Sequence, residues 1–320
     1  MAVNVFKAAF MEILIMANAV NNNVLTATSP SITTGISLGQ VLASKMLEAT
    51  MVQEIFVDGR GCTEFVEPGA FSVRVAVQKS LGDGRDFSAA GSVYADAVLP
   101  ENAEKVVDLK YVWDKPVDLP SVVFDASPVD IYLPTIRNIG KSIGAYSNKI
   151  VLGLIGADAN NTEADGAAET AFKGISAAIA GLEQGDAALG FDRFSTEDAV
   201  IVCSPAFYAK LLAENLVVFK DALDGRENAG FKGYYNGQIP VYVLNDTYFK
   251  LATGSRVATD VATKGVAMVI GGNAIAKGKA PSREVITIQN PNGQGTRLLP
   301  LTRFGYAVVS PKGIQTTTLA

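Results

Sequence analysis

The chain has 320 residues, of which 48% are hydrophobic and 18% charged, and its formal net charge is −5. This length allows one large domain or two modest ones, and the apolar content excludes disorder throughout the chain. The acidic balance lacks the basic excess of a dedicated nucleic-acid binder, and the absence of histidine removes the commonest general base and transition-metal ligand. The surplus of apolar over charged residues favours a surface buried against other subunits, with a large, well-filled monomer as the alternative.

Residues 1–20 combine an early lysine, an apolar stretch and an Ala-x-Ala ending, a loose resemblance to a signal peptide. Glu12 within the apolar stretch argues against that interpretation and favours an amphipathic arm. Because no run of about 18 uninterrupted apolar residues occurs, the sequence predicts no transmembrane helix. A Thr/Ser-rich linker continues to Thr34, and Ser37 is predicted to cap a helix that runs to about Ile55.

The segment Phe71–Gln78 alternates large apolar with polar or small residues, which predicts a strand with one buried face. Its predicted partner is the segment from Val106 to Trp113. The residues between Lys79 and Val106, about 26 of them, are rich in Gly, Asp, Ala and Ser. A structureless loop of that length is uncommon in a compact domain. It indicates an elongated hairpin that contacts another subunit, with a disordered segment as the alternative.

A long helix is predicted from Ser127-Pro128, where a hydroxyl cap precedes proline at the first helical position, to about Ile155. At about 1.5 Å per residue, 28 residues would span roughly 42 Å. Gly140 and Gly144, four apart, would allow another backbone to approach closely. One apolar seam is expected at helical spacing: Tyr132, Ile136, Ile139, Ile143, Tyr146 and Ile150.

The remaining elements alternate without the regular spacing of βαβ units, which favours an α+β fold. A polar, Ala-rich loop is expected over 157–171. Helices are predicted over 172–183 and, after Ser204-Pro205, over 206–215. Strands are predicted over 199–203, 239–244, 266–270, 285–289 and 306–309.

Two patterns that suggest a reactive side chain fail on chemical grounds. Gly35-x-Ser37-x-Gly39 matches the nucleophile elbow of hydrolases, but the usual triads need a histidine base, so Ser37 is interpreted as a helix cap. Cys62 and Cys203 lie too far apart in the sequence to match metal or redox spacing. Both are expected to be small buried hydrophobes.

Ligand-binding patterns are equally incomplete. Asp158-x-Asn160-x-Thr162 faintly resembles a calcium loop that would end at Glu169, but Glu163 stands where the sharp turn needs glycine. The Gly271–Lys279 segment and Gly82-x-Gly84 do not complete a phosphate-binding motif and are interpreted as turns.

Asp221 and Asp224 have the spacing of any solvated helix face. We therefore expect no catalytic, cofactor-binding or metal-ligating residue, no cofactor, and no enzymatic activity.

Four segments carry a resemblance to a known family. The segment 118–125 leads into the long helix, 201–212 is a strand–proline–helix unit, and 237–246 and 265–271 contain later strands. In this order and spacing, they make residues 36–320 similar to the Hong Kong 97-like fold of tailed-bacteriophage major capsid proteins. The resemblance implies an arm, a peripheral domain with a spine helix, an extended loop and an axial domain. The implied boundaries are arm 1–35, peripheral 36–70, loop 71–118, peripheral with spine helix 119–159, axial 160–280 and closing peripheral strands 281–320.

The resemblance implies a structural subunit whose pentamers and hexamers tile an icosahedral shell around packaged double-stranded DNA. It would belong to the virion of a member of the Caudoviricetes and assemble in the cytoplasm of the host bacterium. Implied partners are other copies of the chain, a separate scaffolding protein, a portal, a cement protein and, weakly and without specificity, the DNA, but no membrane. Relatives that crosslink Lys to Asn draw attention to Lys79, for which no partner asparagine is indicated. The alternatives are an encapsulin-like compartment shell, a histidine-free enzyme, and a tail or adhesin component.

Overall fold

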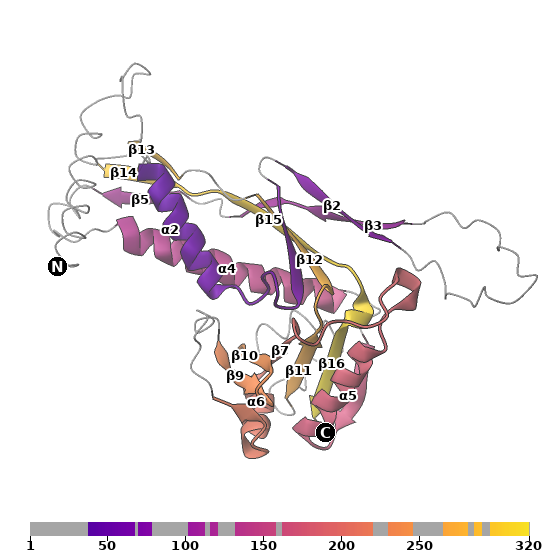
Figure 1. Ribbon diagram of the computed structural model, residues 1–320. Helices are drawn as coiled ribbons and strands as arrows, with labels where there is room; N and C mark the ends of the chain where they lie inside the picture. Colours follow the sequence, from indigo (N-terminus) through magenta and orange to yellow (C-terminus); the bar gives the residue numbers. More distant parts are fainter. Residues whose placement is uncertain are drawn as a thin grey trace, which may run out of the picture.

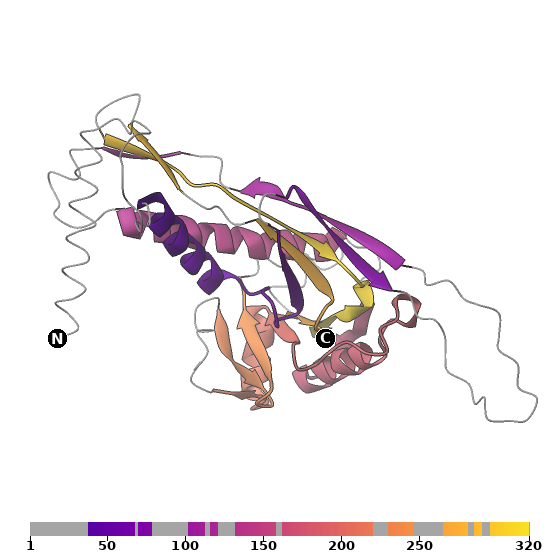
Figure 2. The same cartoon turned by 45° about the horizontal axis from the view of Figure 1, so that its top comes forward.

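The computed structural model describes residues 38–67, 70–78, 102–112, 116–120, 132–157, 162–219, 230–245, 265–280, 285–289 and 295–319. The predicted arm, the tip of the predicted hairpin and the predicted helix start at Ser127 lie outside these residues. In both views, the long helix α4 lies between a β-hairpin on one side and a seven-stranded sheet on the other (Figures 1 and 2). Within the described ranges, no helix has the length and apolar character to span a bilayer.

The two helices α2 (Leu38–Gln53) and α4 (Tyr132–Ala157) pack against each other. A Cβ atom at Gly140 would stand 2.4 Å from the carbonyl oxygen of Met46, and one at Gly144 would stand 2.7 Å from that of Thr50. The Thr50 hydroxyl lies 2.8 Å from the Met46 oxygen and 3.1 Å from the Gly140 oxygen and donates to both. The predicted close approach of a second backbone at the two glycines is therefore confirmed.

The predicted apolar seam of α4 is confirmed at Ile136, Ile139 and Ile143, which are buried. It is wrong at Tyr146, whose side chain is 51% exposed. Ser147 and the residue after it, Asn148, are buried in its place. The helix turns an aromatic residue outward here because the interior position needs groups that can form hydrogen bonds.

A four-stranded sheet lies against α4, in the order β1-β12-β15-β4 among the described strands. Its members are β1 (Cys62–Val66), β12 (Ile275–Ala280), β15 (Thr302–Val308) and β4 (Lys110–Val112). β1 runs parallel to β12, and β15 runs antiparallel to it. The strand predicted over 306–309 corresponds to β15, which begins earlier, while β1 and β12 were not predicted.

The seven-stranded sheet has the order β6-β16-β11-β7-β10-β9-β8 within the described residues. Three predicted strands are confirmed as β7 (Val200–Cys203), β10 (Ile239–Val243) and β11 (Val266–Ile270). The predicted loop over 157–171 is wrong at Thr162–Ala168, which forms β6, parallel to β16. The unpredicted strands are β8 (Val217–Val218), β9 (Phe231–Tyr235) and β16 (Ile314–Leu319).

Two predicted helices, α5 (Ala171–Glu183) and α6 (Pro205–Ala213), are confirmed and share an apolar core with this sheet. Hydroxyl caps explain where they begin. Thr170 accepts from the Lys173 amide at 3.2 Å, and Ser204 accepts from the Phe207 amide at 3.4 Å. Short 3-10 helices occupy Ala187–Leu189 and Pro311–Gly313.

The hairpin consists of β2 (Ser72–Gln78) and β3 (Asn102–Asp108), paired antiparallel along their whole length. The predicted first strand is confirmed except at Phe71, which precedes β2, is 68% exposed, and lies under the Arg303 guanidinium at 4.7 Å. The predicted partner strand begins earlier than Val106. Its continuation, Lys110–Val112, belongs to the four-stranded sheet.

A three-stranded antiparallel sheet has the order β13-β14-β5 among the described strands. It consists of β13 (Ile286–Gln289), which confirms the strand predicted over 285–289, β14 (Gly295–Leu299) and β5 (Val117–Pro120). It lies near the first turn of α4, where the Tyr132 hydroxyl donates to Thr296 at 3.0 Å. In both views this sheet and the β2–β3 hairpin lie toward opposite ends of the body (Figures 1 and 2).

Candidate functional site

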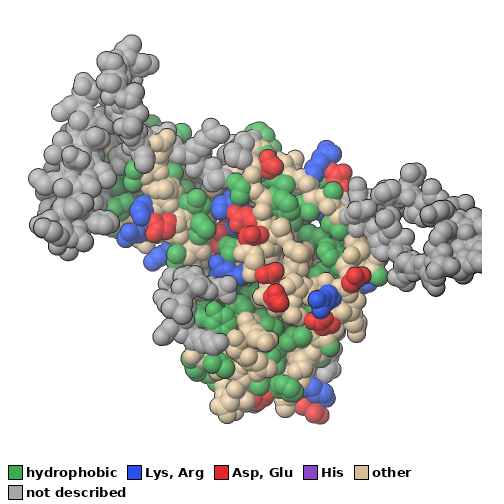
Figure 3. Space-filling model, in the orientation of Figure 1, with side chains coloured by type: hydrophobic (Ala, Val, Ile, Leu, Met, Phe, Trp, Pro, Cys, Tyr) green, Lys and Arg blue, Asp and Glu red, His purple; other side chains and the backbone are tan. Residues whose placement is uncertain are grey.

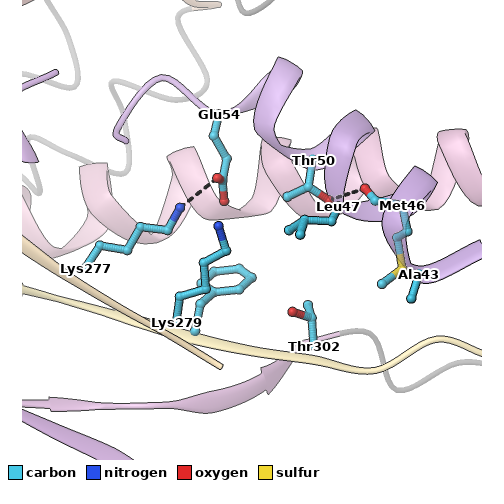
Figure 4. Close-up of a pocket in the computed structure, with 9 residues that line it drawn as sticks. Ala43, Met46, Leu47, Thr50, Glu54, Lys277, Lys279 and Thr302 are labelled. Atoms are coloured by element: carbon cyan, nitrogen blue, oxygen red, sulfur yellow. Dashed lines mark hydrogen bonds and ion pairs between the residues drawn. The ribbon is translucent and has the colours of Figure 1, made fainter. Parts of the chain in front are cut away.

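A buried ion pair joins the end of α2 to the four-stranded sheet. Lys277 of β12 places its Nζ 2.7 Å from Oε2 of Glu54, which follows α2 directly, and the two side chains are 1% and 2% exposed. Figure 4 shows the carboxylate and the ammonium pointing toward each other. A buried charge is tolerated only when it is paired and hydrogen-bonded, so the two side chains depend on each other.

A second acid and a second base complete the cluster. Glu64 of β1 lies 2.7 Å from the Lys279 ammonium and 3.9 Å from that of Lys277. Burial acts to raise the pKa of Glu64, but the ammonium groups of Lys277 and Lys279 outweigh it and hold that pKa below its ordinary value. Two acids and two bases therefore balance in charge. We refer to Glu54, Glu64, Lys277 and Lys279 as the ionic cluster.

A small pocket opens beside the ionic cluster, between α2 and strands β12 and β15 (Figure 4). Its walls are mainly apolar, and its three charged residues, Glu54, Lys277 and Lys279, all belong to the cluster, where each is already paired. The pocket therefore offers no unpaired charge to a ligand. Its lining residues are Ala43, Met46, Leu47, Thr50, Glu54, Lys277, Lys279, Thr302 and Phe304.

Buried polar groups of α4 extend this network. Ser147 forms a hydrogen bond with the hydroxyl of Tyr306, whose ring lies 5.7 Å from the Lys277 ammonium. Burial, with a further contribution from Glu54, raises the pKa of Tyr306 well above its ordinary value, so the phenol stays protonated. Asn148 accepts from the Ile55 amide at 3.0 Å and donates to the Gln53 oxygen at 3.1 Å. These bonds hold the α2 terminus on α4.

Neither cysteine is poised for reaction. Cys62 and Cys203 are both free and buried, as expected, and burial raises the pKa of each thiol far above its ordinary value. A thiol in such an environment is not a nucleophile at neutral pH.

The glycine-rich segment from Gly271 to Lys279 divides into a turn and a strand. The predicted turn is confirmed at Gly272 and Asn273, and Asn273 adopts a positive φ of 64°. The following residues form β12, so Lys277 and Lys279 extend from a strand into the ionic cluster. The lysines are paired with carboxylates and do not form a phosphate cradle.

The other sequence candidates are only partly visible. Ser37, Lys79, Asp221 and Asp224 lie outside the described residues, as do Gly82-x-Gly84 and the first half of the calcium-like loop. Glu169, where that loop would end, is exposed and lies 3.9 Å from Lys173. Within the ranges that the structure describes, no group of three or more His, Cys, Asp or Glu side chains could hold a metal ion.

The ionic cluster has no counterpart among the patterns in the sequence. Glu54 and Lys277 are separated by 223 positions, so no local pattern connects them. One signal was available in the sequence of Ile275–Ala280, where two lysines stand among apolar and small residues. Lysines that face solvent usually have other polar residues as neighbours in the sequence.

The described surface carries large apolar side chains in several places. Figure 3 shows hydrophobic and uncharged side chains over much of one face, with charges scattered among them. On the hairpin, Val73 and Val107 are buried against the body, whereas Val75 and Val77 on the same face are only half-buried. The apolar face of β2 thus continues beyond the part that its own subunit buries fully, and Lys105 of β3 lies opposite Val75 on that face.

Three solved structures place this fold among phage capsids. The capsid of Ralstonia phage GP4 is 10% identical and matches over 93% of this chain and 98% of that chain, with a TM-score of 0.60. The head of Helicobacter pylori bacteriophage KHP40 is 12% identical, over 94% and 99%, with a TM-score of 0.56. The acid-stable capsid of Helicobacter pylori bacteriophage KHP30 is 10% identical, over 95% and 97%, with a TM-score of 0.55.

No protein-family model and no curated protein sequence matches the chain. At these identities the structural likeness shows the fold alone. The chain therefore has the mixed helix-and-sheet fold of these phage capsid structures, over nearly its whole length and theirs.

Proposed function

We propose that the chain is the major capsid protein of a tailed bacteriophage, with a Hong Kong 97-like fold. In this proposal, pentamers and hexamers of the chain tile an icosahedral shell that encloses packaged double-stranded DNA. The observation that carries it is the likeness to three phage capsid structures, which spans more than nine-tenths of both chains in each case. At this coverage, neither this chain nor those chains contain a large additional domain that the other lacks. Such a domain could have indicated a different activity.

The β2–β3 hairpin is the described part of the proposed extended loop of residues 71–118, although β4 and the start of β5, also within that range, belong to other sheets. On the face that carries Val73, Val75 and Val77, β2 is apolar, and burial by the subunit decreases along the strand from Val73 onward. Lys105 of β3 lies opposite Val75 on this face. The opposite face carries Arg74 and Glu104, paired at 3.2 Å, together with Val106, which is 51% exposed. The valines that the subunit leaves partly exposed would be stabilised if a neighbouring copy of the chain covered them.

The proposed domains follow the sheets. We assign α2, α4 and the four-stranded sheet to the peripheral domain, and α5, α6 and the seven-stranded sheet to the axial domain. Two expected boundaries then change. β12 (Ile275–Ala280) joins the peripheral sheet rather than closing the axial domain, and β16 (Ile314–Leu319) joins the axial sheet rather than the closing peripheral strands.

We propose a structural role and not an enzymatic one. The ionic cluster neutralises its own charges, and both thiols are buried. Neither the cluster nor the thiols are arranged as an activated catalytic group. Other copies of the chain are the partners that this role requires; the scaffolding protein, portal, cement protein, DNA contact and assembly in the bacterial cytoplasm remain predictions.

Assembly of the purified chain tests the proposal. Sedimentation velocity and electron microscopy should reveal capsomers, tubes or closed shells in crowding conditions. Val75→Asp, on the apolar face of the hairpin, should reduce this assembly at least ten-fold, whereas Ala76→Asp, on its exposed opposite face, should not. A chain that stays monomeric up to about 100 μM would overturn the proposal, and particles loaded with a protein cargo would favour the encapsulin-like alternative.

A further inference from the structure

The three-stranded sheet has two faces, which its strand register separates. In an antiparallel pair, residues directly opposite each other project from the same face. Ile286 pairs with Leu299, Ile288 pairs with Arg297, and Arg297 pairs in turn with Asp118 of β5. These five residues therefore share one face, which we call the outer face.

The inner face belongs to the core of the subunit. Leu298 and Leu119 lie on it and are 0% and 7% exposed. Both belong to the apolar cluster formed with α2 and α4. The sheet is thus anchored to the body through its inner face, and the outer face is directed away from the core.

The outer face is apolar at one end and neutral in charge. Ile286 is 51% exposed and Ile288 is 42% exposed. Leu299 of β14, directly opposite Ile286, is half-buried. Arg297 and Asp118 form a bidentate pair, with N–O distances of 2.6 and 2.8 Å. Among the described residues of β13, β14 and β5, this pair contains the only charges. The face therefore presents two exposed isoleucines beside a self-neutralised ion pair.

The edge of this sheet is also open. β13 pairs with β14 on one side, and no described strand pairs with its other side. Its sequence, Ile-Thr-Ile-Gln, contains no lysine, other charge or proline. Exposed edge strands normally carry such residues to prevent association with other chains. An apolar face next to an unprotected edge indicates that another surface covers this sheet.

We propose that the outer face of the β13–β14–β5 sheet docks against a second copy of this chain. This inference rests on the proposed shell function. A charged partner such as nucleic acid would find no unpaired charge to bind on this face, because Arg297 and Asp118 already pair with each other. Two copies of a neutral, apolar surface can approach each other without like-charge repulsion.

The size of the patch also favours a second copy. Two isoleucines and a half-buried leucine fall far short of the roughly 800 Å² per partner that a stable free complex buries. Such a contact holds only where other contacts keep the partner at high effective concentration. Copies of one chain, brought together through the hairpin in a shell, meet this condition. The contact would then form during assembly and not between free subunits.

Substitutions along β13 test the contact. Ile288→Lys should lower the yield of assembled particles at least ten-fold while leaving the unfolding midpoint of the free subunit unchanged. Ile288→Val, which keeps the apolar surface, should assemble normally. Gln289→Lys adds the same charge at the next residue, on the other face, and should also assemble. If Gln289→Lys abolishes assembly as well, the strand edge and not the outer face makes the contact, and the proposal fails in this form.

Labelling reports on the contact directly. The buried thiols Cys62 and Cys203 should not compete, so a maleimide should label Ile288→Cys rapidly in free subunits and at least ten-fold more slowly in assembled particles. Equal labelling in both states, with normal assembly of Ile288→Lys, would overturn this inference and leave the proposed function intact. Protection already in the free subunit would identify the chain's own residues as the cover, and protection only after a different protein is added would identify that protein. Either result overturns the second copy, whereas a parent chain that never assembles contradicts the proposed function itself.

Discussion

Lys277 and Glu54 form an ion pair at 2.7 Å with almost no exposure to solvent, across 223 positions of sequence. Lys45 and Glu48 form a pair of the same length on the surface of α2, with side chains 39% and 61% exposed. The two pairs have identical chemistry and differ in burial. They therefore separate the effect of a buried charge from that of an ion pair as such.

Lys277→Met should destabilise the subunit by about 3–5 kcal/mol, because it leaves the buried carboxylate of Glu54 without its cation. Lys45→Met should cost less than about 1 kcal/mol, since water screens the surface pair. The double variant Lys277→Met with Glu54→Leu should recover most of the loss. Urea unfolding followed by circular dichroism measures all three, and a loss below about 1 kcal/mol for Lys277→Met would contradict the pairing.

Gly140→Ala and Gly144→Ala should each destabilise the subunit by about 1–3 kcal/mol, because the added methyl group meets the α2 backbone. Gly153, in the same helix, has no neighbouring atom within 4 Å of the added position. Gly153→Ala should therefore stabilise the helix by up to about 1 kcal/mol. Thermal unfolding of the three variants tests the helix contact, and equal effects at all three positions would exclude it.

Stability should fall on acidification in a way that depends on Glu64. Its pKa is below the ordinary value in the folded state, so ionised Glu64 stabilises the fold above its unfolded pKa. This contribution is lost as the pH falls through the folded pKa, which lies below that of an ordinary glutamate. Glu64→Gln should thus be less stable than the parent at pH 7 and lose less of its unfolding free energy between about pH 5 and pH 3. Parallel pH profiles for the two proteins would argue against the cluster.

Glu214→Ala should destabilise the subunit by about 1 kcal/mol. Its carboxylate accepts from the amides of Ala171 at 2.9 Å and Phe172 at 2.8 Å, at the positive end of the α5 dipole. Glu183, an exposed acid at the last residue of α5, provides the control. Glu183→Ala removes a charge that the dipole disfavours and should be neutral or slightly stabilising. Denaturant unfolding distinguishes the two, and no difference would show that the cap is dispensable.

Elements with a local signal could be predicted from the sequence. Ser204-Pro205 begins α6, and the uninterrupted apolar run at 266–270 forms β11, because caps and burial patterns act over a few neighbouring residues. β6 could not be predicted in this way. Its Ala-rich, polar sequence has no strand periodicity, and it becomes a strand through parallel pairing with β16, about 150 residues later.

The candidate site depended still more on distant residues. The helical spacing of the apolar residues places Tyr146 in the buried seam of α4, in keeping with the rule that aromatic side chains are buried more often than serine. That rule fails here because Ser147 satisfies the hydroxyl of Tyr306, which comes from a strand far along the chain. The pairing of Lys277 with Glu54 has the same origin. Polar residues inside this core can be understood only once their partners are known.

The strand β16 lies inside the seven-stranded sheet, between β6 and β11, although it contains some of the last residues of the sequence. Because β16 pairs with β6, which lies about 150 residues earlier, and with β11, this part of the sheet closes only when segments far apart in the sequence meet. Contacts between such distant segments form slowly. The strand β6 and the helix α5, which packs against β16, therefore cannot reach their final environment in any fragment that lacks β16.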